Sequence, residues 1–327
     1  MRSAIIVPIS YEGDSVLHLL QDLLAQVSDQ DGIYAVLTGA REHYSSLITL
    51  AHDNPALHLC QGVGAFPGEA RNIGIAAAQD ATFIVQIDAG CFIAPDWLNS
   101  ILEPLTSDTC DYVVGAIHPY RSATELWGVR LDREALFAAL TQQRMRRQGD
   151  MPGGAAIAYR RKLWEAAGGY PENLRCGEDK FFAERVAALG PRVLFVESAV
   201  AYWELGPQVS NIVGREYRYS MHDALLPQIT KAVRIKLGEC LALFLMILFS
   251  LMWPPCLWLL VIPLAYLLVN TAKKVRRYEA IAQDKWQKLT PLGYALIFVL
   301  NFVVLCSRLL GTARGMAQRT VKGARYV

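Results

Sequence analysis

Two long apolar stretches near the carboxyl end constrain the possible folds of this chain more than any other feature. Residues 237–270 contain a single charged side chain, Glu239, and a second apolar run covers residues 292–306. Such lengths suit helices in a lipid bilayer better than helices in a water-soluble core. We therefore divide the 327 residues into a first part, residues 1–225, and a membrane region, residues 226–327.

The first apolar stretch is too long for one upright crossing and has Pro254-Pro255 at its middle. We expect a helical hairpin over residues 238–270, with helices at 238–253 and 256–270. One long kinked crossing is the alternative, because neighbouring helices can satisfy the carbonyl groups that a proline frees. Basic residues flank both ends, among them Lys231 before the stretch and Lys274 after it. Since basic flanks tend to stay in the cytoplasm, they favour the hairpin.

A third apolar helix is expected at residues 291–310, and a basic tail that includes Arg314 and Arg325 follows it. A full crossing would put this tail outside, against the positive-inside tendency. The alternative is a helix that lies along the membrane face, with its tail held by anionic lipid. The apolar run at the amino terminus is too short for a signal peptide, so we expect the first part to face the cytoplasm, at the cytoplasmic membrane.

Overall charge and cysteine usage argue against two other classes of protein. The net charge is only +2, which does not favour nucleic acid as a partner. The seven cysteines form no Cys-x-x-Cys pair, so a metal centre or a disulfide framework is not indicated. Buried free thiols are the expected state in the cytoplasm.

Short apolar runs and helical spacings alternate through the first part. The predicted strands are residues 4–9, 33–37, 57–60, 83–87 and 112–117, and the predicted helices are residues 15–27, 70–78 and 95–105. This alternation predicts an α/β fold with a mostly parallel sheet. Ligands of such sheets bind at the carboxyl ends of the strands.

One acidic side chain, Asp88, directly follows the apolar strand at residues 83–87. An ionised carboxylate is costly to bury, so it belongs either in a simple turn or in a ligand site at the strand end. Arg71, in a helix start just before this strand, either faces water or orients a carboxylate or phosphate. Gly153-Gly154 either forms a plain turn or brings backbone amides near a sugar or phosphate.

Two further clusters bear on this edge of the sheet. Glu178 and Asp179 precede a predicted helix at residues 181–189, where one acid is enough to cap the helix and a second is available as a general base. Arg215 and Arg218 lie one helical turn apart. They either clamp a diphosphate together or face anionic lipid.

Six short motifs follow one another in an order and spacing typical of one enzyme family. They are Pro-Gly-Glu-Ala-Arg-Asn-x-Gly-Ile at 67–75, Asp-Ala-Gly-Cys at 88–91, Gly-Gly-x-Ala-x-Ala-Tyr-Arg-Arg at 153–161, Ala-Gly-Gly-Tyr-Pro-Glu at 167–172, Gly-Glu-Asp at 177–179 and Arg-x-x-Arg-Tyr at 215–219. In this order the chain resembles a membrane-attached, bacterial-type family 2 glycosyltransferase, with Asp-Ala-Gly-Cys in place of the Asp-x-Asp motif.

The resemblance implies a GT-A fold over residues 1–225, a nucleotide-diphosphate sugar as donor, a divalent cation (Mg²⁺ or Mn²⁺) and inversion at the anomeric carbon. It implies that Asp179 is the general base, that Glu178 supports it or meets the acceptor, and that Asp88 contacts the donor or the metal. The other residues implied at the donor are Pro8, Ser10, Glu12, Arg71, Ala89, Gly90 and Gly154, and those implied at the acceptor or diphosphate are Arg215, Arg218 and Tyr219.

The chain departs from the family pattern in two places. Gly90 stands where the second acid of the metal motif would be, so a cation would need water, donor phosphates or another ligand such as Glu204 or His222. The second strand is followed by Thr38-Gly39-Ala40, which lacks the usual acids, so the resemblance implies no particular nucleobase.

These observations predict a hexosyltransferase-type enzyme that adds a sugar to a glycan or lipid-linked acceptor, for envelope or extracellular polysaccharide or glycolipid synthesis. A polyprenyl-phosphate glycosyltransferase is the alternative within the same class. Gly90 also suggests a non-catalytic membrane scaffold that binds a nucleotide sugar. A third hypothesis is a membrane protein whose first part binds a partner.

Overall fold

The computed structural model describes residues 2–11, 13–119, 123–126, 129–141, 148–203, 209–225, 261–282 and 290–322, with a few single positions between 238 and 253. The chain divides into two compact units. The first unit comprises residues 1–120 and 145–205, and the second comprises residues 121–144 and 206–327. The domain boundary expected at residue 226 stays a prediction, although compactness groups residues 206–225 with the helices that follow them.

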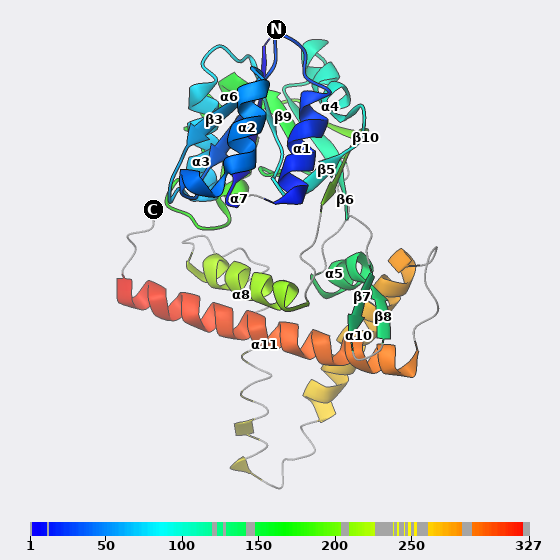
Figure 1. The fold of residues 1–327 in the computed structure, drawn as a ribbon. Helices are drawn as coiled ribbons and strands as arrows, with labels where there is room; N and C mark the ends of the chain where they lie inside the picture. The colour runs from blue at the N-terminus through cyan, green and yellow to red at the C-terminus, as the bar shows by residue number, and fades with distance from the viewer. Residues whose placement is uncertain are drawn as a thin grey trace. The chain divides into compact units, whose positions relative to one another are not determined.

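The described strands of the first unit form one sheet in the order β3-β2-β1-β4-β9-β6-β10-β5 (Figure 1). Their bounds are β1 Ser3–Ile9, β2 Gly32–Leu37, β3 Leu57–Gln61, β4 Phe83–Gln86, β5 Cys91–Ile93, β6 Tyr112–Pro119, β9 Ile157–Arg160 and β10 Val193–Trp203. Strands β1 to β4 pair in parallel, as does β10 with β6, whereas β9 runs antiparallel to β4 and β6, and β5 antiparallel to β10. The predicted α/β fold is confirmed, and the carboxyl ends of β1, β2 and β4 lie along one edge.

Helices cover both faces of this sheet. They are α1 Asp14–Leu24, α2 Ser45–Asp53, α3 Pro67–Ala77, α4 Trp97–Thr106, α6 Arg161–Ala166 and α7 Glu178–Ala188, with a short 3₁₀ turn at Arg41–His43. Side chains of β1 alternate between the two cores: Ile5 packs in the cluster that holds Leu19 of α1 and Trp97 of α4. Ile6 packs in the cluster that holds Phe182 of α7. This alternation is the period of a strand buried on both sides.

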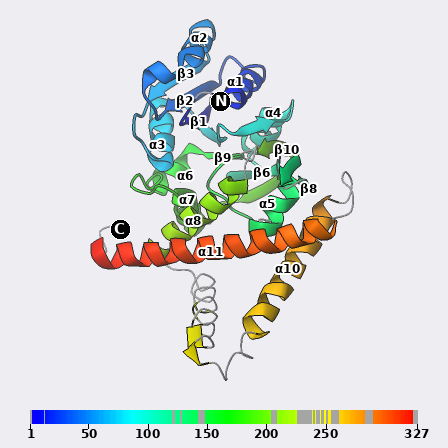
Figure 2. The same ribbon diagram turned by 60° about the horizontal axis from the view of Figure 1, so that its bottom comes forward.

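The second unit begins with a hairpin of β7 (Ala123–Leu126) and β8 (Val129–Asp132), followed by α5 (Arg133–Thr141). Its remaining helices are α8 (Val209–Leu225), α10 (Val261–Ala282) and α11 (Pro291–Lys322). Figures 1 and 2 show α8 beside α11. A Cβ on Gly311 or Gly315 would lie 2.3 or 2.2 Å from a carbonyl oxygen of α8, so only glycine allows this close packing.

The membrane region differs from its predicted limits. Much of the expected hairpin lies outside the described residues, but α10 does not end at residue 270 and continues to Ala282. Lys274, expected in a basic flank, is buried in this helix, and its ammonium donates to the carbonyls of Ala139 and Leu140 at 3.2 and 2.7 Å. These carbonyls end α5, where a cation is favourable.

The third apolar helix is also longer than predicted, because α11 runs to Lys322 rather than to residue 310. Gly311 and Gly315 continue the helical face that packs on α8. Within the described residues, one stretch, Pro291–Gln318, is long and apolar enough to cross a membrane.

Candidate active site

Asp88 lies at the carboxyl end of β4, where the buried strand gives way to a turn. The Cys91 amide donates to the Asp88 carbonyl at 3.0 Å, which closes this turn. The Asp88 side chain is 47% exposed, and its Oδ1 accepts a hydrogen bond from Nη2 of Arg71 at 3.0 Å. The turn uses the backbone carbonyl of Asp88 and not its side chain, so the carboxylate is available to a ligand.

Arg71 joins this carboxylate to a second one. It projects from α3 with a side chain that is 5% exposed, and its Nη1 donates to Oε1 of Glu178 at 2.6 Å. Its guanidinium carbon lies 5.5 Å from the centre of the Tyr170 ring. Burial lowers the pKa of Arg71, but the charges of Asp88 and Glu178 outweigh it and raise the pKa overall. We call these three residues the Asp88–Arg71–Glu178 chain.

Glu178 is the first residue of α7, so the helix begins three residues earlier than predicted. Gly177 precedes it at a φ of +87°, a conformation that glycine adopts without strain and that turns the chain into the helix. The Glu178 side chain is 7% exposed. Burial raises its pKa, Arg71 opposes this shift, and Asp179 adds to it.

Asp179, the next residue, is half-buried beside the glycine pair predicted at the site. Its Oδ1 accepts the Lys180 amide at 2.9 Å. A Cβ on Gly153 would lie 2.0 Å from the Asp179 carbonyl oxygen, and a Cβ on Gly154 would lie 3.5 Å from its Oδ2. Gly153 is therefore required for the loop to touch the first turn of α7, and Gly154 leaves the carboxylate uncovered.

A buried tyrosine that the sequence analysis did not single out supports this loop. The Tyr170 hydroxyl donates to the Gly153 carbonyl at 2.8 Å, and its ring stacks on Phe182 of α7 at 3.9 Å between centroids. The Tyr112 hydroxyl donates to the neighbouring Pro152 carbonyl. Burial raises the pKa of Tyr170 well above its usual value, so the phenol stays a donor. Its only sequence signal was a place inside the Ala-Gly-Gly-Tyr-Pro-Glu motif.

The other residues predicted at the donor lie at or near the same edge, except one outside the described residues. Pro8 is half-buried near the carboxyl end of β1, and Ser10 is exposed just beyond it, while Glu12 lies outside the described residues. Ala89 and Gly90 form the turn after Asp88. A Cβ on Gly90 would meet nothing within 4 Å among the described residues, so the turn has open space there.

Arg215, Arg218 and Tyr219 lie on α8 in the second unit. The Arg215 guanidinium carbon lies 5.0 Å from the centre of the Tyr219 ring, and Arg218, one turn along the helix, is exposed. The predicted helical spacing is confirmed. Their contribution to the donor or acceptor site stays a prediction.

A metal ion would find few protein ligands here. Within the parts of the chain that the structure describes, no group of three or more His, Cys, Asp or Glu side chains is arranged to hold a metal. Glu204 lies outside the described residues, and His222 lies on α8. Asp88 offers Oδ2, which has no hydrogen-bond partner among the described residues. The five cysteines that the structure describes form no disulfide with one another.

A sheet of this topology, with carboxylates at the carboxyl edge of its parallel strands, defines a GT-A glycosyltransferase fold. Residues 4–167 match Glycosyl transferase family 2, and the chain belongs to this family. The predicted family, fold and enzyme class are therefore confirmed: the protein is a glycosyltransferase.

Solved structures that resemble this one are distant in sequence. The mannosyltransferase PcManGT from Pyrobaculum calidifontis, in complex with GDP-Man and Mn²⁺, is 18% identical with a TM-score of 0.54, over 95% of this chain and 87% of that one. TarS residues 1–349 from S. aureus are 14% identical with a TM-score of 0.47, over 99% of this chain and 92% of that one. The chain spans 42% of the longer TarS structure. No curated protein matches it.

Proposed function

We propose that this glycosyltransferase moves a sugar, with inversion, from a nucleotide-diphosphate sugar to a hydroxyl of a glycan or lipid-linked acceptor at the cytoplasmic face of a membrane. The observation that carries the proposal is the placement of Asp179 directly beside the Asp88–Arg71–Glu178 chain. The nucleotide sugar in a solved structure of similar fold, GDP-Man in PcManGT, supports this donor class.

Asp179 is the carboxylate we assign as the general base. A sugar hydroxyl is a weak nucleophile, and a base that takes its proton in the transition state contributes roughly 10²–10⁴-fold. Glu178 is a poorer candidate, because it is buried and its carboxylate is held by Arg71 at 2.6 Å. Glu178 therefore serves as a positioning residue, which fixes Arg71 and the first turn of α7.

Asp88 fits a cation site of the kind in which the substrate supplies most ligands. Mg²⁺ and related ions are commonly held by one or two carboxylates together with substrate phosphates and water. One half-exposed carboxylate, whose Oδ2 has no hydrogen-bond partner within the described part of the chain, meets that requirement. When bound, Mg²⁺ or Mn²⁺ would neutralise charge on the donor diphosphate. Arg71 would keep Asp88 turned toward the open edge whether or not the ion is present.

Membrane attachment and a lipid-linked acceptor belong to the same proposal. The first turns of α10 expose Val261, Leu264 and Leu268, a surface that suits lipid. A polyprenyl phosphate is the acceptor that such a surface would serve most directly. An acceptor screen with polyprenyl phosphate and soluble oligosaccharides, which follows radioactive sugar into lipid or water, separates the two acceptor classes.

The decisive experiment is a donor screen with the purified full chain, with and without Mn²⁺ or Mg²⁺, that measures released nucleotide. We expect Asp179→Asn to keep the thermal midpoint and to lose roughly 10²–10⁴-fold in turnover. Asp22→Asn, an exposed acid on α1, is the matched control and should retain activity. Full transfer by Asp179→Asn would refute the base assignment. Donor binding without turnover in the parent chain would favour the scaffold hypothesis.

A further inference from the structure

Helix α11 exposes an apolar stripe along most of its length. Leu292, Val299, Val303 and Leu310 are 53%, 42%, 38% and 65% exposed. Their spacings of seven, four and seven residues place them on one side of a helix with 3.6 residues per turn. We call these four residues the α11 stripe. Phe302, which is also exposed, widens it by one position.

Helix α11 also packs against α8, α10 and α5, through polar as well as apolar contacts. The most polar is an ion pair, in which Nε of Arg308 donates to Oε2 of Glu216 at 2.6 Å. Further polar contacts join Arg308 to the Leu140 carbonyl, Tyr294 to Glu279, Asn301 to Thr271, Ser307 to the Val213 carbonyl and Arg314 to Tyr217.

These contacts argue against a membrane crossing by α11. They extend from residue 294 to residue 314, and 20 residues of helix span about 30 Å, which is the thickness of the hydrocarbon core. A crossing would therefore carry the Arg308–Glu216 pair and the charged helix α8 into the bilayer interior, at a high desolvation cost.

Helix α10 marks where the membrane boundary lies relative to α11. Residues 261–269 of α10 expose apolar side chains on several sides, as lipid-facing helices do. Further along, Thr271 and Lys274 are buried, and Thr271 bonds Asn301 of α11. Figures 1 and 2 show α10 running away from the line of α11. Helix α11 thus contacts α10 at the point where the surface of α10 changes from exposed apolar side chains to side chains packed against protein.

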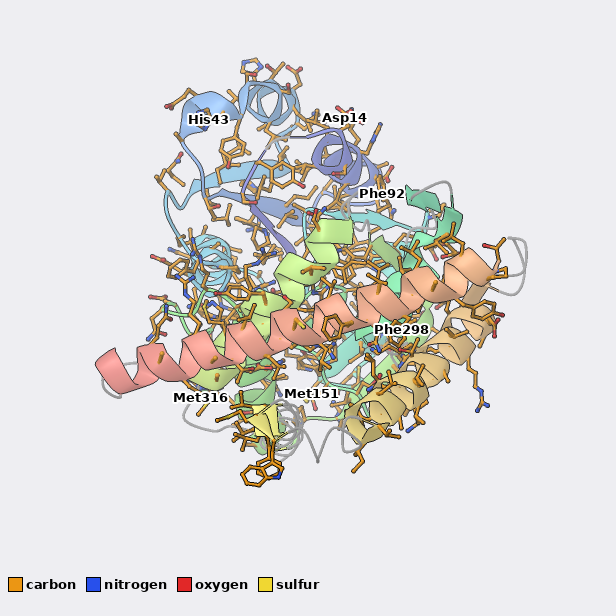
Figure 3. The ribbon with its side chains drawn as sticks, turned by 90° about the horizontal axis from the view of Figure 1, so that it is seen from below. Asp14, His43, Phe92, Met151, Phe298 and Met316 are labelled. Carbon is orange, nitrogen blue, oxygen red and sulfur yellow. The ribbon has the colours of Figure 1, made fainter. Side chains whose placement is uncertain are left out.

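We propose that α11 lies in the plane of the membrane, with the α11 stripe at the boundary between headgroups and acyl chains. Figure 3 looks onto this helix, whose course Phe298 and Met316 mark. Exposed Lys273 and Arg276 on α10 would face anionic headgroups. The stripe contains no acid to oppose them. This inference rests on the membrane attachment in the proposed function, and it specifies how α11 is oriented relative to the membrane.

Depth measurement in anionic vesicles tests the orientation. Single cysteines at Leu292, Val303 and Leu310 would carry a nitroxide or a fluorophore, in a full-length chain whose native cysteines are replaced and whose donor binding is retained. An in-plane helix gives these positions nearly equal depths. A crossing helix gives a V-shaped profile, because Leu292 and Leu310 would lie near opposite surfaces, about 27 Å apart along the helix.

Leu264 of α10, expected deep in the acyl region, is the internal control, and Val304, buried on the packed face of α11, should remain screened from lipid. A V-shaped profile overturns the inference. The inference is also overturned if the α11 stripe does not contact lipid while Leu264 does, because protein or a second copy of the chain would then cover the stripe. If Leu264 also avoids lipid, the membrane attachment itself fails.

Discussion

Replacement of Arg71 by Met should destabilise the first unit more than any other single charge removal in it. The side chains of Arg71 and Glu178 are 5% and 7% exposed, so removing one partner leaves a buried carboxylate unpaired. Breaking such a pair costs about 3–5 kcal/mol. The contact with Asp88 adds little, because that carboxylate is 47% exposed and water screens it, which limits an ion pair to about 1 kcal/mol.

The loss should depend on pH with a definite sign. Burial raises the folded pKa of Glu178 above its unfolded value, so the folded state binds the proton more tightly. Ionised Glu178 therefore destabilises the folded state, and this penalty is complete above the folded pKa. The penalty disappears as the pH falls through the folded pKa toward the unfolded pKa of about 4.3. Without Arg71 the folded pKa rises further. The deficit of Arg71→Met should be large near pH 8 and smaller near about pH 5.

Thermal unfolding of the full chain in detergent measures this effect. For a domain of this size about 3–5 kcal/mol corresponds to roughly 6–20 °C. Arg2→Met, which removes an exposed partner of Asp80, is the matched control and should shift the midpoint by little. Adding Glu178→Gln to Arg71→Met should restore much of the loss. Equal deficits at both pH values, or no gain from the second substitution, would refute the buried-pair explanation.

Three further substitutions probe the site and the second unit. Tyr170→Phe leaves the buried Gly153 carbonyl without its hydrogen-bond donor, which costs about 1–3 kcal/mol of stability. This substitution should lower kcat more than it changes KM. Tyr202→Phe, at a more exposed tyrosine, is the control. Gly90→Asp adds the missing second acid in open space and should tighten Mn²⁺ binding by about tenfold, or about 1.4 kcal/mol. A Mn²⁺ titration of nucleotide release measures this change, and the control Gly90→Ala should not show it. Gly311→Val would place Cβ 2.3 Å from a carbonyl oxygen of α8 and should lower the thermal midpoint of the second unit; an unchanged midpoint would contradict the close packing.

The sequence predicted the elements that have a strong local signal. Alternating apolar runs gave strands β1, β2, β3, β4 and β6, because a buried strand needs apolar residues on both faces. Asp88 and Glu178, which the sequence placed near the same edge of the sheet, both bind Arg71 in the structure, while their roles in catalysis stay predictions. The predicted start of α7 was too late. The turn directly before Glu178 depends on the positive φ of Gly177, and this backbone conformation leaves no apolar pattern in the sequence.

Long-range contacts were the part that local patterns could not give. Arg71 and Glu178 are 107 positions apart, and the pair forms only because α3 and α7 pack on the same face of the sheet. Lys274 looked like a flanking charge, yet it caps the end of α5, an element 134 positions earlier. Tyr170 was missed for a similar reason, because a hydrogen bond to a backbone carbonyl leaves no signature in the partner residue.

The charges at the site decide whether a cation is needed despite the glycine at position 90. Asp88, Glu178 and Asp179 carry three formal negative charges, and Arg71 returns one positive charge, so the cluster is net −2 at formal charges. A donor diphosphate is also about −2, and like charges about 5 Å apart repel by several kcal/mol at an effective dielectric of about 20. A divalent cation held by Asp88 would reduce this repulsion, which a second acid at position 90 would only have increased. We therefore expect nucleotide-diphosphate binding, followed by calorimetry, to weaken at least tenfold on chelation, about 1.4 kcal/mol, and Asp88→Asn to bind the nucleotide with less dependence on Mn²⁺. Equal affinity in chelator and in Mn²⁺ would show that basic groups elsewhere in the chain neutralise the diphosphate instead.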